Sequence, residues 1–327
     1  MQTSFESRLK EYKTRVDTRI TEILNEQHPV DLYEPMRYAL QAGGKRLRPV
    51  LLLAACDAVG GDVNDALDVA AALEIVHNFT LVHDDIMDRD ETRRGRETVY
   101  RHWDENVAIL SGDGLLVKAY AELKHVSPDL LPDILTEFSR GILKVCEGQT
   151  LDMNFENRHT VSLDEYFEMI RKKTAAFFSL ACQLGGMLGR GSPEQIEALA
   201  AYGLYLGIAF QVQDDLLDIV SDTAVLGKDA GSDIKAGKKT FLMLHALANG
   251  TPQQIDDLRA VIKKENVTET DINVVRELFL SIGSMQMAAA EIKRSLAVAN
   301  QTLQLLQPGE GRTFMKDTLK LIENRTF

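Results

Sequence analysis

Long stretches of the chain place apolar residues among polar ones without the strict alternation of a half-buried strand. The sequence has 8 prolines, and none lies between Leu51 and Ser127 or between Asp133 and Ser192, which leaves room for long helices. The pattern predicts an all-α protein. Its expected helices cover residues 4–26, 32–42, 47–59, 66–88, 107–123, 129–154, 163–186, 194–221, 239–248, 253–264, 269–280 and 284–306.

Local signals support several helix ends. Ser192 precedes Pro193, an N-cap followed by a first-turn proline, and Gly60-Gly61 follows the predicted helix that ends at Val59. A chain of 327 residues is long enough for about two domains. No linker rich in Pro, Ser or Gly interrupts it, so we expect a single domain over residues 1–327.

Two copies of one acidic motif follow apolar helical stretches, Asp84-Asp85-Ile86-Met87-Asp88 and Asp214-Asp215-Leu216-Leu217-Asp218. In a helix, residues i and i+4 share a face, so Asp84 and Asp88 should project together, as should Asp214 and Asp218. Like charges in this arrangement repel each other, and a buried carboxylate needs a cationic partner. A hard divalent metal is therefore expected between them.

One such cluster alone would equally suit a solvated helix end, but two copies with identical spacing make that interpretation weak. An EF-hand calcium loop is excluded, because Arg89 stands at the sixth position, where glycine is required. Magnesium fits better, since it is usually held by one or two carboxylates and by substrate phosphates. The expected ligand is a polyphosphate.

Short basic motifs could hold such a phosphate. They are Gly43-Gly44-Lys45-Arg46-Leu47-Arg48-Pro49, Arg93-Arg94-Gly95, Lys172-Lys173-Thr174, Gly227-Lys228 and Gly237-Lys238-Lys239-Thr240. Each alone is more often surface decoration. The whole chain is acidic, with 37 Lys and Arg against 49 Asp and Glu, which disfavours nucleic acid or an anionic membrane as a partner. Basic clusters on an acidic protein indicate a small anionic ligand.

These motifs, in this order from residue 43 to residue 238, resemble those of the trans-isoprenyl diphosphate synthases, or polyprenyl synthetases. The resemblance implies a single large helical bundle of the isoprenoid synthase type with a central apolar cavity. It also implies Mg²⁺-dependent head-to-tail condensation of isopentenyl diphosphate with allylic diphosphates (dimethylallyl, geranyl, farnesyl), giving a short all-trans product.

The resemblance assigns roles to individual residues. Metal ligands are expected at Asp84, Asp88, Asp214 and Asp218, with Asp85 and Asp215 binding directly or through water, and three Mg²⁺ ions are implied. The allylic diphosphate would contact Arg93, Lys173, Lys228 and Lys238. The diphosphate of isopentenyl diphosphate would contact Lys45, Arg48, His77 and Arg94. Thr174 and Gln211 would lie near the developing allylic cation, where their oxygen dipoles help. The expected catalytic residues are therefore Asp84, Asp85, Asp88, Lys173, Thr174, Gln211, Asp214 and Lys228.

Product length is expected to depend on the helix that ends at the first acidic motif. Val76, Phe79 and Thr80 fall on one helical stripe beside Asp84 and Asp88. Phe79 precedes Asp84 by about 7.5 Å of helix, so its ring could form a floor for the growing chain. The resemblance favours a geranylgeranyl diphosphate product, with farnesyl diphosphate next.

Two alternatives remain open from the sequence. A terpene cyclase of the same fold would also use an acidic motif, but its second metal motif normally mixes Asn, Ser or Thr, and Glu. A regulatory subunit of a prenyl synthase should show decay of one motif, whereas Asp84 to Asp88 and Asp214 to Asp218 are both intact.

The remaining features suggest a cytoplasmic protein. Cys56, Cys146 and Cys182 all lie in apolar helical segments, so they are expected to be reduced core thiols. Residues 4–19 are rich in both charges, unlike a signal peptide. Residues 198–213 carry no charge, but they are fewer than the ~20 residues that span a bilayer. The resemblance also implies a homodimer, with residues 110–123 and 134–146 as interface helices.

Overall fold

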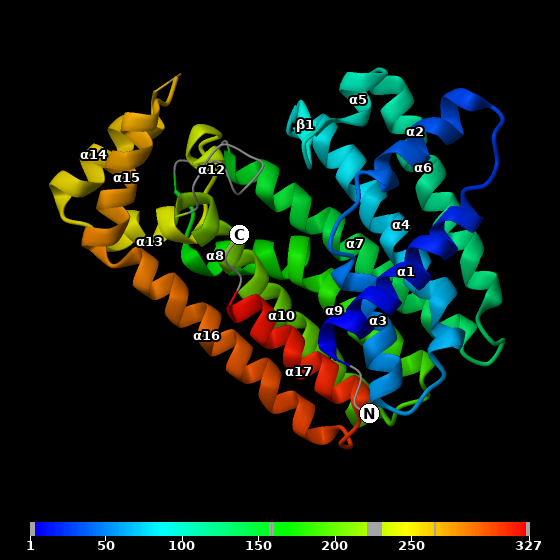
Figure 1. Cartoon of the computed structure of the whole chain (residues 1–327). Coiled ribbons are helices and arrows are strands. Elements are labelled where there is room, and N and C mark those ends of the chain that lie inside the picture. Colours follow the sequence, from blue (N-terminus) through cyan, green and yellow to red (C-terminus); the bar gives the residue numbers. More distant parts are fainter. Residues whose placement is uncertain (1–3, 157, 159, 221–230, 265, 325–327) are drawn as a thin grey trace. The chain divides into compact units, whose positions relative to one another are not determined.

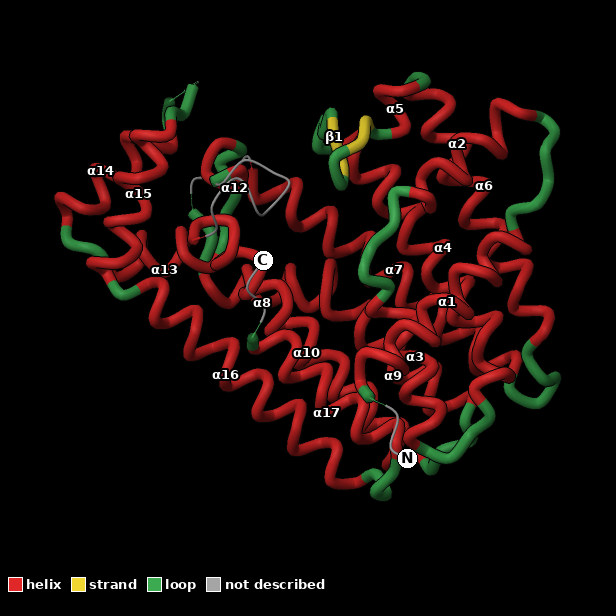
Figure 2. Tube along the Cα trace, in the orientation of Figure 1, coloured by secondary structure: helices red, strands yellow, loops and turns green. Residues whose placement is uncertain are grey.

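The computed structural model describes residues 4–156, 158, 160–220, 231–264 and 266–324. Helices account for nearly all of its regular structure (Figures 1 and 2). In chain order they are α1 (Phe5–Ile23), α2 (Val30–Gln41), α3 (Leu47–Ala58), α4 (Val63–Met87), α5 (Val99–His102), α6 (Glu105–Glu122), α7 (Leu131–Glu156), α8 (Leu163–Ile170), α9 (Ala176–Leu188), α10 (Pro193–Val220), α12 (Ser232–Lys235), α13 (Phe241–Asn249), α14 (Pro252–Ile262), α15 (Glu269–Ile282), α16 (Ser284–Thr302) and α17 (Glu310–Glu323).

The expected all-α fold is confirmed, and the predicted helices occur with ends shifted by a few residues. Their boundaries follow from side-chain caps. Helix α10 begins at Pro193, and the hydroxyl of Ser192 accepts a hydrogen bond from the backbone N–H of Gln195 at 3.3 Å. Helix α3 ends at Ala58, and Gly60 then adopts a left-handed φ of 86°.

Some elements were not predicted. A two-stranded antiparallel hairpin, β1 (Thr92–Arg93) and β2 (Arg96–Glu97), follows α4. Its strands are too short to show an alternating pattern. The C-terminal helix α17 was also missed, because charged residues are interspersed among its buried side chains, such as Phe314 and Met315.

The predicted helix over residues 163–186 is interrupted by a π-helical turn, η2 (Arg171–Ala175), between α8 and α9. Helix α7 approaches this turn closely at Gly148, where a Cβ atom would lie 2.2 Å from the backbone nitrogen of Lys173. Side chains larger than glycine are therefore excluded at this position of α7. Single π turns occur frequently at functional sites.

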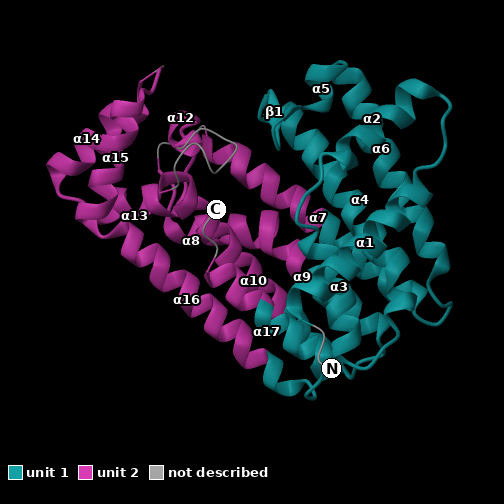
Figure 3. Ribbon diagram, in the orientation of Figure 1, with its two compact units in different colours: residues 1–142, 180–200, 303–317 teal, residues 143–179, 201–302, 318–327 magenta. Residues whose placement is uncertain are grey.

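The described chain divides into two compact units that interleave in sequence (Figure 3). Unit 1 comprises residues 1–142, 180–200 and 303–317, and unit 2 comprises residues 143–179, 201–302 and 318–327. The single domain expected from the sequence stays a prediction. Each unit has its own packed helices.

Helix α4 forms the centre of unit 1. It packs against α1, α3 and α6, and its apolar residues from Val69 to Leu73 are fully buried. Close approach of α4 and α6 depends on Gly112, because a Cβ atom there would lie 2.2 Å from the His83 ring. This packing fixes the C-terminal end of α4, where the first acidic motif lies.

In unit 2, α13 packs against α8, α15 and α16. The rings of Tyr166 on α8 and Phe241 on α13 meet edge to face, with centroids 6.1 Å apart. Both side chains are buried. The contact therefore fixes the start of α13 near the second acidic motif.

The three cysteine thiols are free, and Cys56 and Cys182 are buried as expected. The core placement of Cys146 was wrong, because this side chain is exposed on α7. Its neighbourhood in sequence is apolar, but Leu143 on the same helix is also exposed. The apolar residues in this part of α7 are therefore not all buried within the chain.

Among the described helices, none is both long enough and apolar enough to cross a membrane.

Candidate active site

The first acidic motif lies at the C-terminal end of α4, where its carboxylates divide into two kinds. Asp84 and Asp88 are partly exposed, whereas Asp85 is only 4% exposed. Asp88 ends the helix, and its backbone N–H donates to the carbonyl of Asp84 at 2.8 Å. Asp84 and Asp88 are therefore partly accessible to solvent, while the Asp85 carboxylate is buried.

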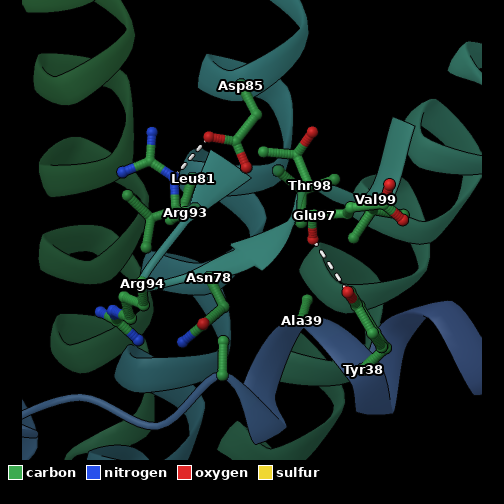
Figure 4. Close-up of a pocket in the computed structure, with 12 residues that line it drawn as sticks. Tyr38, Ala39, Asn78, Leu81, Asp85, Arg93, Arg94, Glu97, Thr98 and Val99 are labelled. Carbon is green, nitrogen blue, oxygen red and sulfur yellow. Dashed lines mark hydrogen bonds and ion pairs between the residues drawn. The ribbon is translucent and has the colours of Figure 1, made fainter. Parts of the chain in front are cut away.

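Asp85 accepts a hydrogen bond from Nε of Arg93, and Figure 4 shows the two side chains facing each other. The Arg93 guanidinium also lies 3.2 Å from Asp90 and 4.0 Å from Asp84. Burial raises the pKa of Asp85 to about 6, although Arg93 opposes the shift. Asp85 thus holds Arg93 beside the exposed acidic pair.

The β1–β2 hairpin presents the adjacent arginine. Arg94 and Gly95 form a two-residue turn in which both φ angles are positive, at 54° and 73°, as in a type I′ hairpin. Nη1 of Arg94 donates to the carbonyl of Gly43. At Gly44, a Cβ atom would lie 2.8 Å from this guanidinium, so the glycine pair admits the arginine. Two of the basic motifs predicted from sequence are therefore in contact.

The three cations at the start of α3, Lys45, Arg46 and Arg48, have different environments. Lys45 is exposed, and Nη1 of Arg48 lies 3.1 Å from Nε2 of His77. Burial lowers the pKa of His77 well below its ordinary value, and Arg48 and Arg94 lower it further. The expected grouping of Arg48, His77 and Arg94 within one unit is thus consistent with an anion site.

Arg46 points inward and supports this loop. It is 6% exposed, has a left-handed φ of 51°, and donates to Glu74 at 2.7 Å, Asp17 at 2.9 Å and the carbonyl of Leu40 at 2.7 Å. The sequence grouped Arg46 with the phosphate-binding cations. The structure makes it a buried structural residue, because its guanidinium is engaged by Glu74, Asp17 and the carbonyl of Leu40.

The second acidic motif, on α10, repeats the division seen in the first. Asp214 and Asp218 are partly exposed, and Asp215 is 4% exposed. Asp218 accepts hydrogen bonds from the Ser232 hydroxyl at 2.7 Å and the backbone N–H of Asp233 at 3.1 Å, which connects it to α12. Burial raises the pKa of Asp215 to about 6, and hydrogen bonds from Phe241, Tyr166 and Gln211 counteract this.

A cavity in unit 2 brings several predicted residues together. Its wall includes Lys173, Thr174, Gln211, Asp215 and Lys238. The Lys173 ammonium donates to Asp152 at 2.6 Å, and the Thr174 hydroxyl donates to Oε1 of Gln211 at 2.7 Å. The predicted Lys228 lies outside the described residues.

Tyr166 and Asp152 also line this cavity, although neither is among the site residues predicted from the sequence. Asp152 had a signal in the sequence, because it ends the α7 segment Gly148-Gln149-Thr150-Leu151-Asp152, which resembles a stretch that lines the cavity in polyprenyl synthetases, although helix packing at Gly148 explains that segment equally well. Tyr166 gave none, because a single tyrosine on an amphipathic helix is usually an ordinary core residue.

Within the described part of the chain, no group of three or more His, Cys, Asp or Glu side chains is arranged to hold a metal by itself. The carboxylate oxygens of Asp84 and Asp88 are nevertheless suitable donors for Mg²⁺, which commonly takes one or two carboxylates and completes its shell with phosphate and water. The donor set therefore fits a metal that binds together with a phosphorylated substrate.

Comparison with known proteins agrees with these features. A short chain isoprenyl diphosphate synthase of Methanothermobacter thermautotrophicus is 40% identical over 305 residues, covering 93% of each chain. The crystal structure of a geranylgeranyl pyrophosphate synthetase from Pyrococcus horikoshii matches with a TM-score of 0.94 and 38% identity over 98% of each chain. A geranylgeranyl pyrophosphate synthase from Corynebacterium glutamicum, complexed with isoprenyl diphosphate and magnesium, matches with a TM-score of 0.89 and 30% identity, covering 97% of this chain and 99% of that one.

The fold is thus the all-α fold of the isoprenyl diphosphate synthases. The polyprenyl synthetase family model matches residues 29–279, and the chain belongs to this family. It is an enzyme of the trans-prenyltransferase class.

Proposed function

We propose that the enzyme joins isopentenyl diphosphate head to tail to an allylic diphosphate and releases a short all-trans product, geranylgeranyl diphosphate in preference to farnesyl diphosphate. The observation that supports this most directly is the duplicated pattern. In each unit, a partly exposed pair of aspartates lies near a basic segment that the buried middle aspartate helps to fix. Two aspartate pairs suited to Mg²⁺ and several groups of cations are what a reaction between two diphosphates requires.

The isopentenyl diphosphate is assigned to Lys45, Arg48, His77 and Arg94. This assignment is supported by the contact of Arg94 with Gly43, in the loop before α3, and by the contact of Arg48 with His77 on α4. Arginine suits the task, since its planar guanidinium can bind phosphate with two parallel hydrogen bonds.

The allylic diphosphate is assigned to Arg93, Lys173, Lys228 and Lys238, and the metal to Asp84, Asp88, Asp214 and Asp218. Bound Mg²⁺, three ions by analogy with the family, would neutralise the leaving diphosphate. The chain's own cations bind and orient that group, and Thr174 and Gln211 provide oxygen atoms for the electron-poor allylic carbon. The released diphosphate accepts the proton that is lost after the carbon–carbon bond forms, so no protein base is assigned.

We also propose a cytoplasmic homodimer. The exposed apolar side chains of α6, Ile109, Leu110 and Val117, support an interface on that helix, since Leu110 is 60% and Val117 is 69% exposed. Leu135 on the neighbouring part of α7 is exposed as well. Sedimentation at micromolar concentration should give the mass of two chains, and a monomer would contradict the proposal.

Product analysis tests the activity. The purified chain is incubated with Mg²⁺, isopentenyl diphosphate and each allylic diphosphate in turn, and the products are treated with phosphatase and separated by chain length. We expect geranylgeraniol as the main alcohol. Cyclic hydrocarbons would identify a cyclase, and absence of product would identify a subunit that needs an active partner.

A further inference from the structure

The hydroxyl of Thr174 makes an unusual hydrogen bond for a helical threonine. Thr136, Thr150 and Thr313 each donate to the carbonyl four residues earlier, at 2.8, 2.9 and 2.8 Å. Thr174 lies in the π turn η2 and instead donates to Oε1 of Gln211 on α10, at 2.7 Å. Its side chain is therefore oriented by a tertiary contact rather than by its own helix.

The direction of that hydrogen bond depends on how the Gln211 amide is turned. Its Nε2 donates to Oδ1 of Asp215 at 3.0 Å, one helical turn further along α10. A carboxylate only accepts, so it selects the amide orientation that places nitrogen toward Asp215 and oxygen toward Thr174. With the amide reversed, two oxygen acceptors would face each other in a buried position.

Asp215 is itself held by donors from two other elements. Oδ2 accepts from the Tyr166 hydroxyl at 2.7 Å and from the backbone N–H of Phe241 at 2.9 Å. Together with Gln211, these donors occupy three of the roughly four acceptor positions of a carboxylate. Tyr166 is 1% exposed and Asp215 is 4% exposed. The carboxylate of Asp215 is thus engaged by groups of the protein itself.

We propose that Tyr166 and Asp215 are positioning residues, which turn Gln211 so that the single hydroxyl hydrogen of Thr174 is engaged and an oxygen lone pair is presented to the cavity of unit 2. A lone pair stabilises a carbon that loses its diphosphate, whereas a hydroxyl hydrogen would repel it. This inference rests on the proposed prenyl transfer. It also removes Asp215 from the metal ligands expected from the sequence.

Asp215→Asn tests the relay. The asparagine oxygen can accept from Tyr166 and Phe241 while its amide donates to Gln211, which reverses Gln211 and makes Thr174 an acceptor. The turnover number should fall by about tenfold to a hundredfold, the usual effect of losing one interaction with a charged centre. The Michaelis constants of both substrates and the Mg²⁺ dependence should stay unchanged, because ground-state binding is not affected.

A double-mutant cycle separates the relay from a direct metal role. If Asp215 acts through Thr174, Asp215→Asn should have little further effect in a Thr174→Val background. Additive losses, or a higher Mg²⁺ requirement in Asp215→Asn, would overturn the proposal. Thr150→Val is the matched control for loss of a helical threonine hydroxyl, and its turnover number should equal that of the wild type.

Two further measurements keep the test informative. If Asp215→Asn does not fold by circular dichroism, Tyr166→Phe takes its place in the cycle, since it removes one donor and preserves the ring. Thr174→Ser keeps the hydroxyl and should recover most of the turnover number lost in Thr174→Val, and a loss equal to that of Thr174→Val would contradict the proposal. Failure of the wild type to form prenyl products would instead refute the proposed function itself.

Discussion

Nε2 of His77 lies 3.1 Å from Nη1 of Arg48, so the imidazole nitrogen must accept this hydrogen bond. A guanidinium has only donors. His77 is therefore neutral, with its proton on Nδ1, and the lowered pKa caused by burial and by Arg48 agrees with this state. His77 therefore lies beside Arg48 as a neutral polar group and adds no charge.

The stability of the enzyme should fall as pH drops below 6.5, in part because of His77. Its folded pKa lies well below 6.5, so between these values the unfolded chain binds a proton that the folded chain does not. The free energy of unfolding that His77 contributes therefore decreases by at most about 1.4 kcal/mol for each pH unit. Urea unfolding of the wild type and of His77→Gln should show their difference changing between pH 7 and pH 5. A constant difference would contradict a neutral His77.

Replacing Arg46 should destabilise the protein and weaken the loop before α3. Glu74 is 2% exposed, and Arg46→Met removes the cation that is hydrogen-bonded to its carboxylate. Loss of one partner of a buried pair typically costs about 3–5 kcal/mol. Urea unfolding should show this loss, and Arg46→Met combined with Glu74→Met should recover part of it. A change below 1 kcal/mol in the single variant would show that the pair is not structurally important.

The two proposed diphosphate sites should be separable by kinetics. Arg48→Ala should mainly raise the Michaelis constant for isopentenyl diphosphate, and Lys238→Ala should act through the allylic substrate, because each removes ground-state binding of one ligand. Arg48→Lys should not restore the wild-type value, since a single ammonium cannot form two parallel hydrogen bonds. Equal effects of both alanine variants on both substrates would refute the assignment.

Metal removal should abolish turnover, and so should replacement of the partly exposed aspartates that we assign to the metal. EDTA is expected to stop the reaction, and Asp84→Ala or Asp214→Ala should lower the turnover number by about 10³-fold with the fold intact. Asp65→Ala is the matched control, because Asp65 is exposed at the other end of α4. A loss below about tenfold in either site variant would contradict a shared metal role.

The sequence predicted the helices well, because they follow from helical periodicity, and the same periodicity is the basis for expecting Asp84 with Asp88 and Asp214 with Asp218 on shared faces. It could not distinguish Asp85 and Asp215 from their neighbours. Their burial depends on Arg93 in a hairpin and on Tyr166 in a distant helix. These are tertiary contacts between segments far apart in the chain, and no local pattern reports them.

Local backbone conformation was the second feature that could not be predicted from the sequence. Lys45 and Arg46 are neighbouring cations that the sequence does not distinguish. In the structure Lys45 is exposed, whereas Arg46, which has a left-handed φ, is buried. The π turn at residues 171–175 was equally hidden, because its residues also fit a regular helix. Such local deviations depend on packing, here on the approach of α7 at Gly148.

Product length should depend on Phe79. Its ring meets that of His83 edge to face at a centroid distance of 4.8 Å, and Nε2 of His83 lies 3.2 Å from the carbonyl of Ile109 on α6. The contact with α6 fixes His83, and through it the phenylalanine that we propose as the floor for the growing chain. Phe79→Ala should therefore shift the products beyond twenty carbons while turnover continues, as measured by chain-length analysis of the dephosphorylated alcohols. If the distribution is unchanged, the floor lies elsewhere, and Val76→Ala, one turn deeper on α4 and fully buried in the wild type, is the next variant to measure.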